Sequence, residues 1–271
     1  MKMIDFVYAG KRLSDYGYII ASVITETEDS LSLGSTLSFN TVKNNATFIN
    51  RIVNIDYDEP ISITFDICKD PRFDRGEIHD SEVTYMMKWL NRKNYEEFRP
   101  VYDDGSYADI YYNGSFNISA IYVGGEIKGF TLAFTSNSPF GYIKDRTVLY
   151  KVANENGSFT YYCDSDEIGY LLPKSFEVTC LASGNLTISN NLDTVHTVSV
   201  KNCENGEVIT FDSKNQLIST NVTHTKLYND FNYSYPRFVV DEDATKNVFT
   251  SSLPCSIKVV YAPVRKVGII V

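Results

Sequence analysis

The sequence predicts a mainly β protein with an N-terminal β-barrel-like domain that packs one α-helix and a C-terminal β-sandwich. Short segments that alternate apolar and polar residues recur along the chain, and Gly, Asn or Asp turns separate many of them. Tyr and Phe, which favour strands, supply nearly all of a 14% aromatic content. The chain of 271 residues is long enough for two domains. Its composition shifts near residues 140–150, so we place the domains at 1–145 and 146–271.

The first domain begins with two expected strands. Residues 3–9 (MIDFVYA) alternate in polarity and end at Gly10, and residues 18–24 form a mostly apolar run. Residues 61–69 (ISITFDICK) give the clearest strand signal, because apolar side chains stand at every second position.

Between these strands lies a polar excursion, residues 26–50, in which alternation is weak. Because it has too few apolar residues for a core of its own, we expect a protruding arm of strand and loop. The apolar positions of this arm are Leu31, Leu33, Leu37 and Phe39.

Residues 79–94 (HDSEVTYMMKWLNRKN) form the one stretch with clear helical spacing. Apolar residues recur at i, i+3, i+4 and i+7, which places them on one face of a helix. We expect a helix over residues 80–93 that covers the sheet, with Asp80 or Ser81 as its cap. Its core-facing side is predicted to consist of Val83, Met86, Met87, Trp89 and Leu90.

Short turns are expected to separate the strands that follow the helix. The pairs at residues 104–105, 113–114 and 124–125 are Asp-Gly, Asn-Gly and Gly-Gly. Such pairs suit tight turns because Gly and Asn tolerate positive φ. Residues 128–136 (KGFTLAFTS) are expected to form the last strand of the first domain.

The second half repeats this pattern at intervals of about ten residues, which is typical of a β-sandwich or a jelly roll. The apolar terminal segment VGIIV, residues 267–271, either closes this sandwich or returns to the first domain. The expected strands are FTYYC (159–163), FEVTCLA (176–182), NLTISNN (185–191), HTVSVKN (196–202), EVITFD (207–212), QLISTN (216–221) and SIKVVYAP (256–263).

The chain is acidic, with 25 Lys and Arg against 34 Asp and Glu and a formal net charge of −9. Residues 1–145 hold 14 basic and 21 acidic residues, or −7, and the remainder holds 11 and 13, or −2. Binding to nucleic acid through its phosphates needs clustered Lys and Arg. We therefore expect no specific nucleic-acid binding.

The five cysteines stand far apart and form no CxxC or Cys/His cluster. This pattern favours reduced thiols over a disulfide framework or a zinc site. The N-terminus lacks the apolar region of a signal peptide, and no stretch approaches the roughly 20 apolar residues of a membrane span. We therefore expect no membrane span.

Catalytic motifs are missing from the sequence. His79, His196 and His224 are scattered, and the chain contains no GxSxG, HExxH, Walker or GxGxxG motif. The acidic run at residues 56–59 (DYDE) lacks the spacing and glycine of an EF-hand calcium loop. We expect no enzymatic activity, no cofactor and no metal, and a β-rich hydrolase is the weakest alternative.

A series of segments in a fixed order carries a family resemblance over nearly the whole chain. They are FVYAGKRLSDYGYII, GSTLSFNTVKNN, ITFDICK, MMKWLNRKNYEEFRP, GFTLAFTSNSPFGY, NGEVITFDSKNQLI, YNDFNYSYPRF and PCSIKVVYAPVRKVGI. In this order they resemble the distal tail protein family of long-tailed (siphovirus) bacteriophages that infect Gram-positive bacteria. No segment is a catalytic signature.

The resemblance implies a virion protein at the distal end of the tail, synthesised in the cytoplasm of the bacterial host. Its N-terminal domain would form a sixfold ring, with a galectin-like β-sandwich as the C-terminal domain. The ring would join the tail tube protein to a tail-associated hub or fibre protein, and it can also hold a receptor-binding protein. The sugar-binding residues of true galectins have no convincing match in this sequence.

Three hypotheses follow for the surfaces of such a protein. The four apolar residues of the arm would bury against a neighbouring subunit, and the acidic first domain would line a lumen through which DNA passes. Alternatively, the second domain would bind host cell-wall glycan by stacking sugar rings on Tyr161, Tyr162 and Tyr170.

Overall fold

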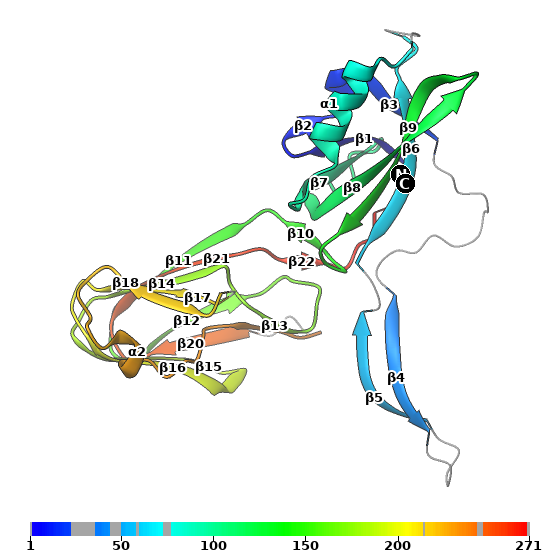
Figure 1. Ribbon diagram of the computed structural model, residues 1–271. Coiled ribbons are helices and arrows are strands. Elements are labelled where there is room, and N and C mark those ends of the chain that lie inside the picture. The colour runs from blue at the N-terminus through cyan, green and yellow to red at the C-terminus, as the bar shows by residue number, and fades with distance from the viewer. Residues whose placement is uncertain are drawn as a thin grey trace. The chain divides into compact units, whose positions relative to one another are not determined.

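The chain folds into two compact units (Figure 1). The first holds the chain up to Ile143 and the C-terminal segment from Arg265, and the second is Lys144–Val264. The first of these divisions lies within two residues of the boundary expected at 145/146. The computed structural model describes residues 2–22, 36–43, 50–57, 60–72, 77–213, 215–242 and 246–269.

A large antiparallel sheet forms the body of the first unit. Its described strands follow the order β2-β1-β7-β8-β9-β6-β3, with β10 paired to β8. The sheet is curled into a half-barrel. It stays open because its first and last described strands, β2 and β3, do not pair with each other. The elements are β1 (Met3–Tyr8), β2 (Lys11–Arg12), η1 (Ser14–Tyr16), β3 (Tyr18–Ser22), β6 (Ser62–Lys69), β7 (Glu96–Tyr102), β8 (Ile110–Val123), β9 (Glu126–Ser136) and β10 (Gly141–Ile143).

Two of the three expected turns connect these strands, and the third does not. Gly105 lies between β7 and β8, and residues 124–125 lie between β8 and β9, all with positive φ. Gly114 instead lies inside β8. A Cβ atom at Gly114 would overlap the Thr135 carbonyl oxygen and the Phe134 ring. The turn expected here is wrong because this glycine permits close packing between strands.

Replacing Gly114 with Ala is expected to lower the free energy of unfolding by about 1–3 kcal/mol, since the added methyl group overpacks the sheet. Ser119 lies on β8 as well but is exposed, so Ser119→Ala should change stability by less than about 0.5 kcal/mol. Urea unfolding measures both values. Equal stabilities for the two variants would contradict the close approach of β8 and β9 at Gly114.

Helix α1 (Asp80–Leu90) packs against the sheet through the side predicted from sequence. Met86, Trp89 and Leu90 are buried, and Val83 packs against the same core. Trp89 donates its indole N–H to the Tyr8 carbonyl oxygen at 2.9 Å. This bond satisfies the polar end of the largest buried side chain and ties α1 to β1.

Other details of the helix differ from expectation. Met87 is 41% exposed, because it lies about 100° around the helix from Met86 and beyond the edge of the buried stripe. The N-cap is His79, whose N–H donates to the Glu82 carboxylate at 2.9 Å, so the caps expected at 80–81 are wrong. The helix also ends at residue 90, three residues before its expected end.

The C-terminal segment returns to the core of the first unit. Ile269 is buried in this core, and Val267 packs against it. The Tyr112 hydroxyl donates to the Val267 carbonyl oxygen at 2.8 Å. Of the two alternatives that the sequence leaves open, the described part of the terminal segment follows the return to the first unit.

The second unit is a β-sandwich of two antiparallel sheets around one apolar core. The described strands follow the order β11-β21-β14-β17-β18 in one sheet and β12-β20-β15-β16 in the other. They are β11 (Arg146–Val152), β12 (Gly157–Tyr162), β14 (Ser175–Cys180), β15 (Gly184–Asn190), β16 (Asp193–Cys203), β17 (Val208–Asp212), β18 (Leu217–Thr220), β20 (Lys246–Ser251) and β21 (Cys255–Tyr261).

Three shorter elements complete the second unit, and a fourth crosses its boundary with the first. Strands β13 (Gly169–Leu171) and β19 (Phe238–Val240) pair with each other outside the two main sheets. Helix α2 (Leu227–Asp230) is a single turn, and β22 (Val264–Arg265) lies where the chain passes back to the first unit. Each of the seven strands expected from sequence in this half has a counterpart. The sequence did not predict β11, β13, β19, β20 and β22.

Candidate functional site

A separate two-stranded ribbon in the first unit carries part of the expected arm. Strands β4 (Leu37–Lys43) and β5 (Asn50–Tyr57) pair with each other in a sheet of their own (Figure 1). Of the four arm residues predicted from sequence, Leu37 and Phe39 lie on β4. Leu31 and Leu33 lie outside the described residues.

The ribbon has one apolar and one polar face. Residues paired across an antiparallel ribbon project to the same side. The register shifts by one residue between Asn40 and Thr41, because β5 holds one extra residue at this point. After the shift, Ile52 lies on the same face as Phe39 and Ile55. The pairs on the apolar face are Leu37 with Tyr57, Phe39 with Ile55 and Thr41 with Ile52. Those on the opposite face, which is polar except at Val42, are Ser38 with Asp56, Asn40 with Asn54 and Val42 with Arg51.

The apolar face is open to solvent in the single chain. Leu37, Phe39, Ile52 and Ile55 are all exposed, and Phe39 retains 55% of its accessible surface. Burying such a side chain contributes about 1.5–3 kcal/mol. A two-stranded ribbon by itself is marginally stable in water. Both considerations point to a partner surface that covers this face.

Sequence reasoning identified only one strand of the ribbon. Ile52 and Ile55 lie outside the predicted arm, which ends at residue 50. Their spacing of three residues breaks strict alternation, which is the consequence of the register shift in the ribbon. At the base of the ribbon, Tyr57 meets Phe140 edge to face, with ring centroids 4.6 Å apart.

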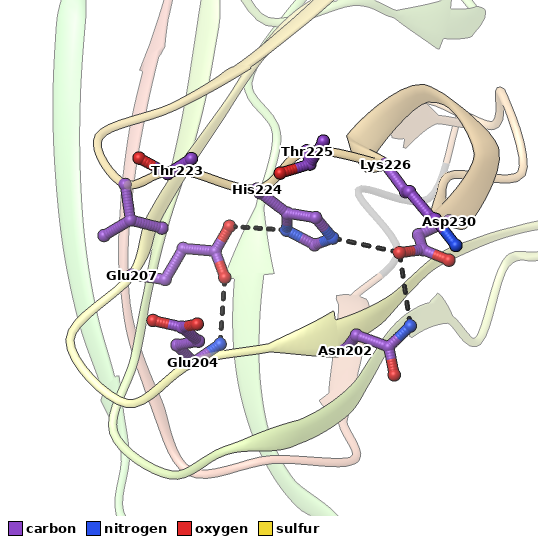
Figure 2. Close-up of a pocket in the computed structure, with 9 residues that line it drawn as sticks. Asn202, Glu204, Glu207, Thr223, His224, Thr225, Lys226 and Asp230 are labelled. Carbon is purple, nitrogen blue, oxygen red and sulfur yellow. Dashed lines mark hydrogen bonds and ion pairs between the residues drawn. The ribbon is translucent and has the colours of Figure 1, made fainter.

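The second unit contains a polar pocket of about 260 Å³ (Figure 2). It lies where the loop after β18 and helix α2 approach the end of β16 and the turn before β17. The pocket is lined by Asn202, Glu204, Glu207, Val222, Thr223, His224, Thr225, Lys226 and Asp230.

His224 occupies the centre of this pocket, between two carboxylates (Figure 2). Its Nδ1 lies 2.9 Å from Oε1 of Glu207, and its Nε2 lies 3.1 Å from Oδ2 of Asp230. The Glu207 side chain is fully buried and that of His224 nearly so. Burial by itself lowers the pKa of His224, but hydrogen bonds to the two carboxylates outweigh it and raise the pKa above its ordinary value.

The cluster in which His224 joins Glu207 and Asp230, called the clasp below, suits a structural role better than that of a catalytic base. Both ring nitrogens of His224 face carboxylates, so the ring has no free nitrogen with which to take a proton from a substrate. Glu207 is also engaged, since it accepts the Glu204 backbone N–H at 2.9 Å and the Thr220 hydroxyl at 2.8 Å. No local pattern predicts this cluster, because Glu207 and Asp230 stand 17 and six residues from His224.

The clasp predicts a specific pH dependence of stability. Because its folded pKa is raised, the His224 imidazolium stabilises the fold fully below the ordinary histidine pKa of about 6.5. This contribution is lost as pH rises through the folded pKa. Urea unfolding of the wild type should therefore show a fall in stability, as pH rises from about 6.5 through the folded pKa of His224, that His224→Gln lacks. Identical pH profiles for both proteins would contradict the clasp.

The residues considered for glycan stacking have different environments. Tyr161 packs against the core and contacts Phe238 and Tyr261, so its ring is already engaged within the fold. Tyr162 and Tyr170 are exposed. A cation lies over each of these two rings, with Lys246 Nζ 5.7 Å from the Tyr162 centroid and the Arg237 guanidinium 4.9 Å from the Tyr170 centroid, so a sugar would have to stack on the opposite face.

The acidic run at residues 56–59 falls partly outside the described residues. Its described member Asp56 accepts a hydrogen bond from the Asn54 side chain at 2.5 Å. Across the described residues, no three His, Cys, Asp or Glu side chains gather in a way that could hold a metal ion. Within the same parts of the chain, no helix is long and apolar enough to cross a membrane.

Comparison with solved structures found matches among phage proteins. The Dit protein of phage SPP1, described as a paradigm of the hub adsorption apparatus in phages infecting Gram-positive bacteria, superposes with a TM-score of 0.67. It shares 12% sequence identity, and the match covers 96% of this chain and 99% of that one. A chain of the activated phage p2 baseplate gives a TM-score of 0.47 at 10% identity, over 96% and 98% of the two chains.

Family comparison covers nearly the whole sequence. No curated protein matches the chain. The phage tail protein N-terminal domain matches residues 1–138, and the phage tail C-terminal domain matches residues 140–261. The chain therefore belongs to the phage tail protein family that these two domains define.

Proposed function

We propose that this phage tail protein is a non-enzymatic adaptor that assembles into a sixfold ring at the distal end of the tail. The ring joins the tail tube protein to the tail-tip hub or fibre protein and supports the receptor-binding apparatus. The protein is synthesised in the host cytoplasm and acts in the virion. The observation that carries this proposal is the exposed apolar face of the β4–β5 ribbon, in a chain whose fold resembles SPP1 Dit.

The ribbon supports ring assembly because its apolar face is exposed in the single chain, and in a ring this face would be covered by a different part of the neighbouring subunit. A contact between two different surfaces generates a closed ring when the rotation between subunits closes. Phe39 and its partner Ile55 would lie at the centre of this contact. The sixfold number and the galectin-like character of the second domain rest on the family resemblance.

The charge distribution supports a lumen that does not retain DNA. Residues 1–145 include 14 basic and 21 acidic side chains, which give this part of the chain a net charge of −7. Adhesion of DNA would need cations that neutralise phosphate, and an acidic wall repels it instead. A map of the assembled ring with a basic channel wall would contradict this part of the proposal.

Native mass spectrometry of the purified full chain, combined with antibody-gold labelling of virions, tests the function. We expect a six-subunit species that accumulates with protein concentration, and gold particles at the distal end of the tail. A monomer at every concentration would argue against the ring. Label on the tail shaft or the capsid would argue against the placement.

A further inference from the structure

Among the described residues, strand β13 is paired along one edge and open along the other. It pairs with β19 in a separate two-stranded sheet. We propose that the open edge of β13 receives an extended segment of another tail protein, one that alternates apolar residues and carries a carboxylate. This interaction lies in the second unit and does not depend on the ring that the ribbon of the first unit is proposed to form.

The hydrogen bonds of β19 determine which way the backbone of β13 faces. Val239 donates its N–H to the Asn247 side-chain oxygen at 2.8 Å, and its carbonyl accepts the Asn247 side-chain amide at 2.9 Å. Val239 therefore bonds away from β13, and its cross-strand neighbour Tyr170 belongs to a non-hydrogen-bonded pair. The N–H and carbonyl of Tyr170 consequently point toward the open edge.

The side chains along this edge are apolar and exposed. Every second residue from Ile168 to Leu172 is a large apolar residue, and the central one, Tyr170, is 58% exposed. An edge strand with free backbone groups and apolar side chains is a template for strand addition. In that binding mode backbone hydrogen bonds give affinity, and alternate side chains give specificity.

A positively charged side chain, Arg237, lies beside Tyr170 and favours a negatively charged group on the partner. The Arg237 guanidinium lies over the Tyr170 ring, 4.9 Å from its centroid. Its Nε is buried and has no hydrogen-bond partner among the described residues. The carboxylate beside it, Asp193, lies 3.6 Å away and also holds the His196 ring at 2.7 and 2.9 Å.

The buried Nε is out of reach of an incoming group, but Arg237 keeps 22% of its side-chain surface exposed, so the rest of its guanidinium can bind one. A guanidinium with spare N–H donors binds a carboxylate well, and a bidentate pair adds geometric specificity. Because Arg237 stacks on Tyr170, a carboxylate bound to it would lie next to the open edge. Charge and shape together favour an acidic, extended peptide segment over a second copy of β13, which would bring another Arg237 to the same place.

A synthetic peptide that alternates Val and Thr and has one central Glu serves as the probe, with a Gln-containing twin as its control. Binding to the full chain is measured by fluorescence anisotropy, and exchange of backbone amides is followed by NMR. We expect the Tyr170 amide to become protected and the Leu171 amide to be unaffected. The Glu peptide should bind about tenfold more tightly than the Gln peptide.

Variants distinguish specific binding at this edge from nonspecific hydrophobic binding. Tyr170→Lys should abolish binding, whereas Leu149→Lys, at a similarly exposed apolar position on β11, should leave it unchanged. Arg237→Gln should remove the preference for the Glu peptide. Binding that survives Tyr170→Lys, or equal affinity for the two peptides, would overturn the proposal. So would self-association of the chain that Tyr170→Lys disperses, since that result would make a second copy the occupant.

Discussion

Phe39→Asp is expected to abolish assembly while leaving a folded subunit. Phe39 is central to the apolar face of the β4–β5 ribbon and makes no part of the core of the first unit. A carboxylate buried at a subunit contact without a partner costs several kcal/mol. This cost is enough to dissociate a ring that depends on the contact at Phe39. Size-exclusion chromatography with light scattering should report a monomer, and circular dichroism should report an unchanged fold.

Asn40→Asp provides a matched control on the same strand. It introduces the same charge on the polar face, one residue away from Phe39. This variant should assemble as the wild type does. Rings formed by Phe39→Asp would show that the ribbon is not the subunit contact, and loss of rings in both variants would show that charge alone disrupts assembly.

Trp89→Ala should destabilise the first unit more than any other single change on α1. The Trp89 side chain is buried, stacks on Phe6 with ring centroids 6.1 Å apart and donates a hydrogen bond to Tyr8. Truncating a buried Trp costs about 3–5 kcal/mol, a large part of the stability of an ordinary domain. Urea unfolding followed by circular dichroism measures the loss.

Met87→Ala is the corresponding control, because Met87 lies on the same helix but is exposed. Its effect should stay within about 0.5 kcal/mol. If Met87→Ala and Trp89→Ala lowered stability equally, the orientation of α1 on the sheet would be wrong.

Much of the fold was predictable because its signals are local. The alternation at residues 61–69 corresponds to β6, and the helical spacing before residue 90 corresponds to α1. The errors occur where tertiary contacts override local signals. Gly114 resembles a turn residue, yet it is needed where β8 packs against β9, and no neighbour in sequence reveals that requirement.

The site was predictable only in part. Leu37 and Phe39 were found as apolar positions in a polar segment, but their partners Ile52 and Ile55 follow an irregular spacing. The clasp around His224 was not predictable, since it depends on how distant loops meet. The open edge of β13 was equally hidden, because it follows from the side-chain hydrogen bonds of Asn247.

Each unit has an apolar core of its own, and further large apolar residues stay exposed on its surface. The β4–β5 ribbon exposes an apolar face, and β13 exposes both apolar side chains and backbone groups. Large apolar surfaces that remain exposed in one chain commonly mark sites of protein–protein contact. The two surfaces lie in different units, so the proposed ring contact and the proposed strand addition can be tested separately.

A cryo-electron microscopy map of the distal end of intact tails tests the central claim most directly. The account predicts six copies around the tail axis, with Phe39 and Ile55 of each copy packed against a neighbouring copy and shielded from solvent. A map in which the β4–β5 ribbon of every copy stands free in solvent would contradict it.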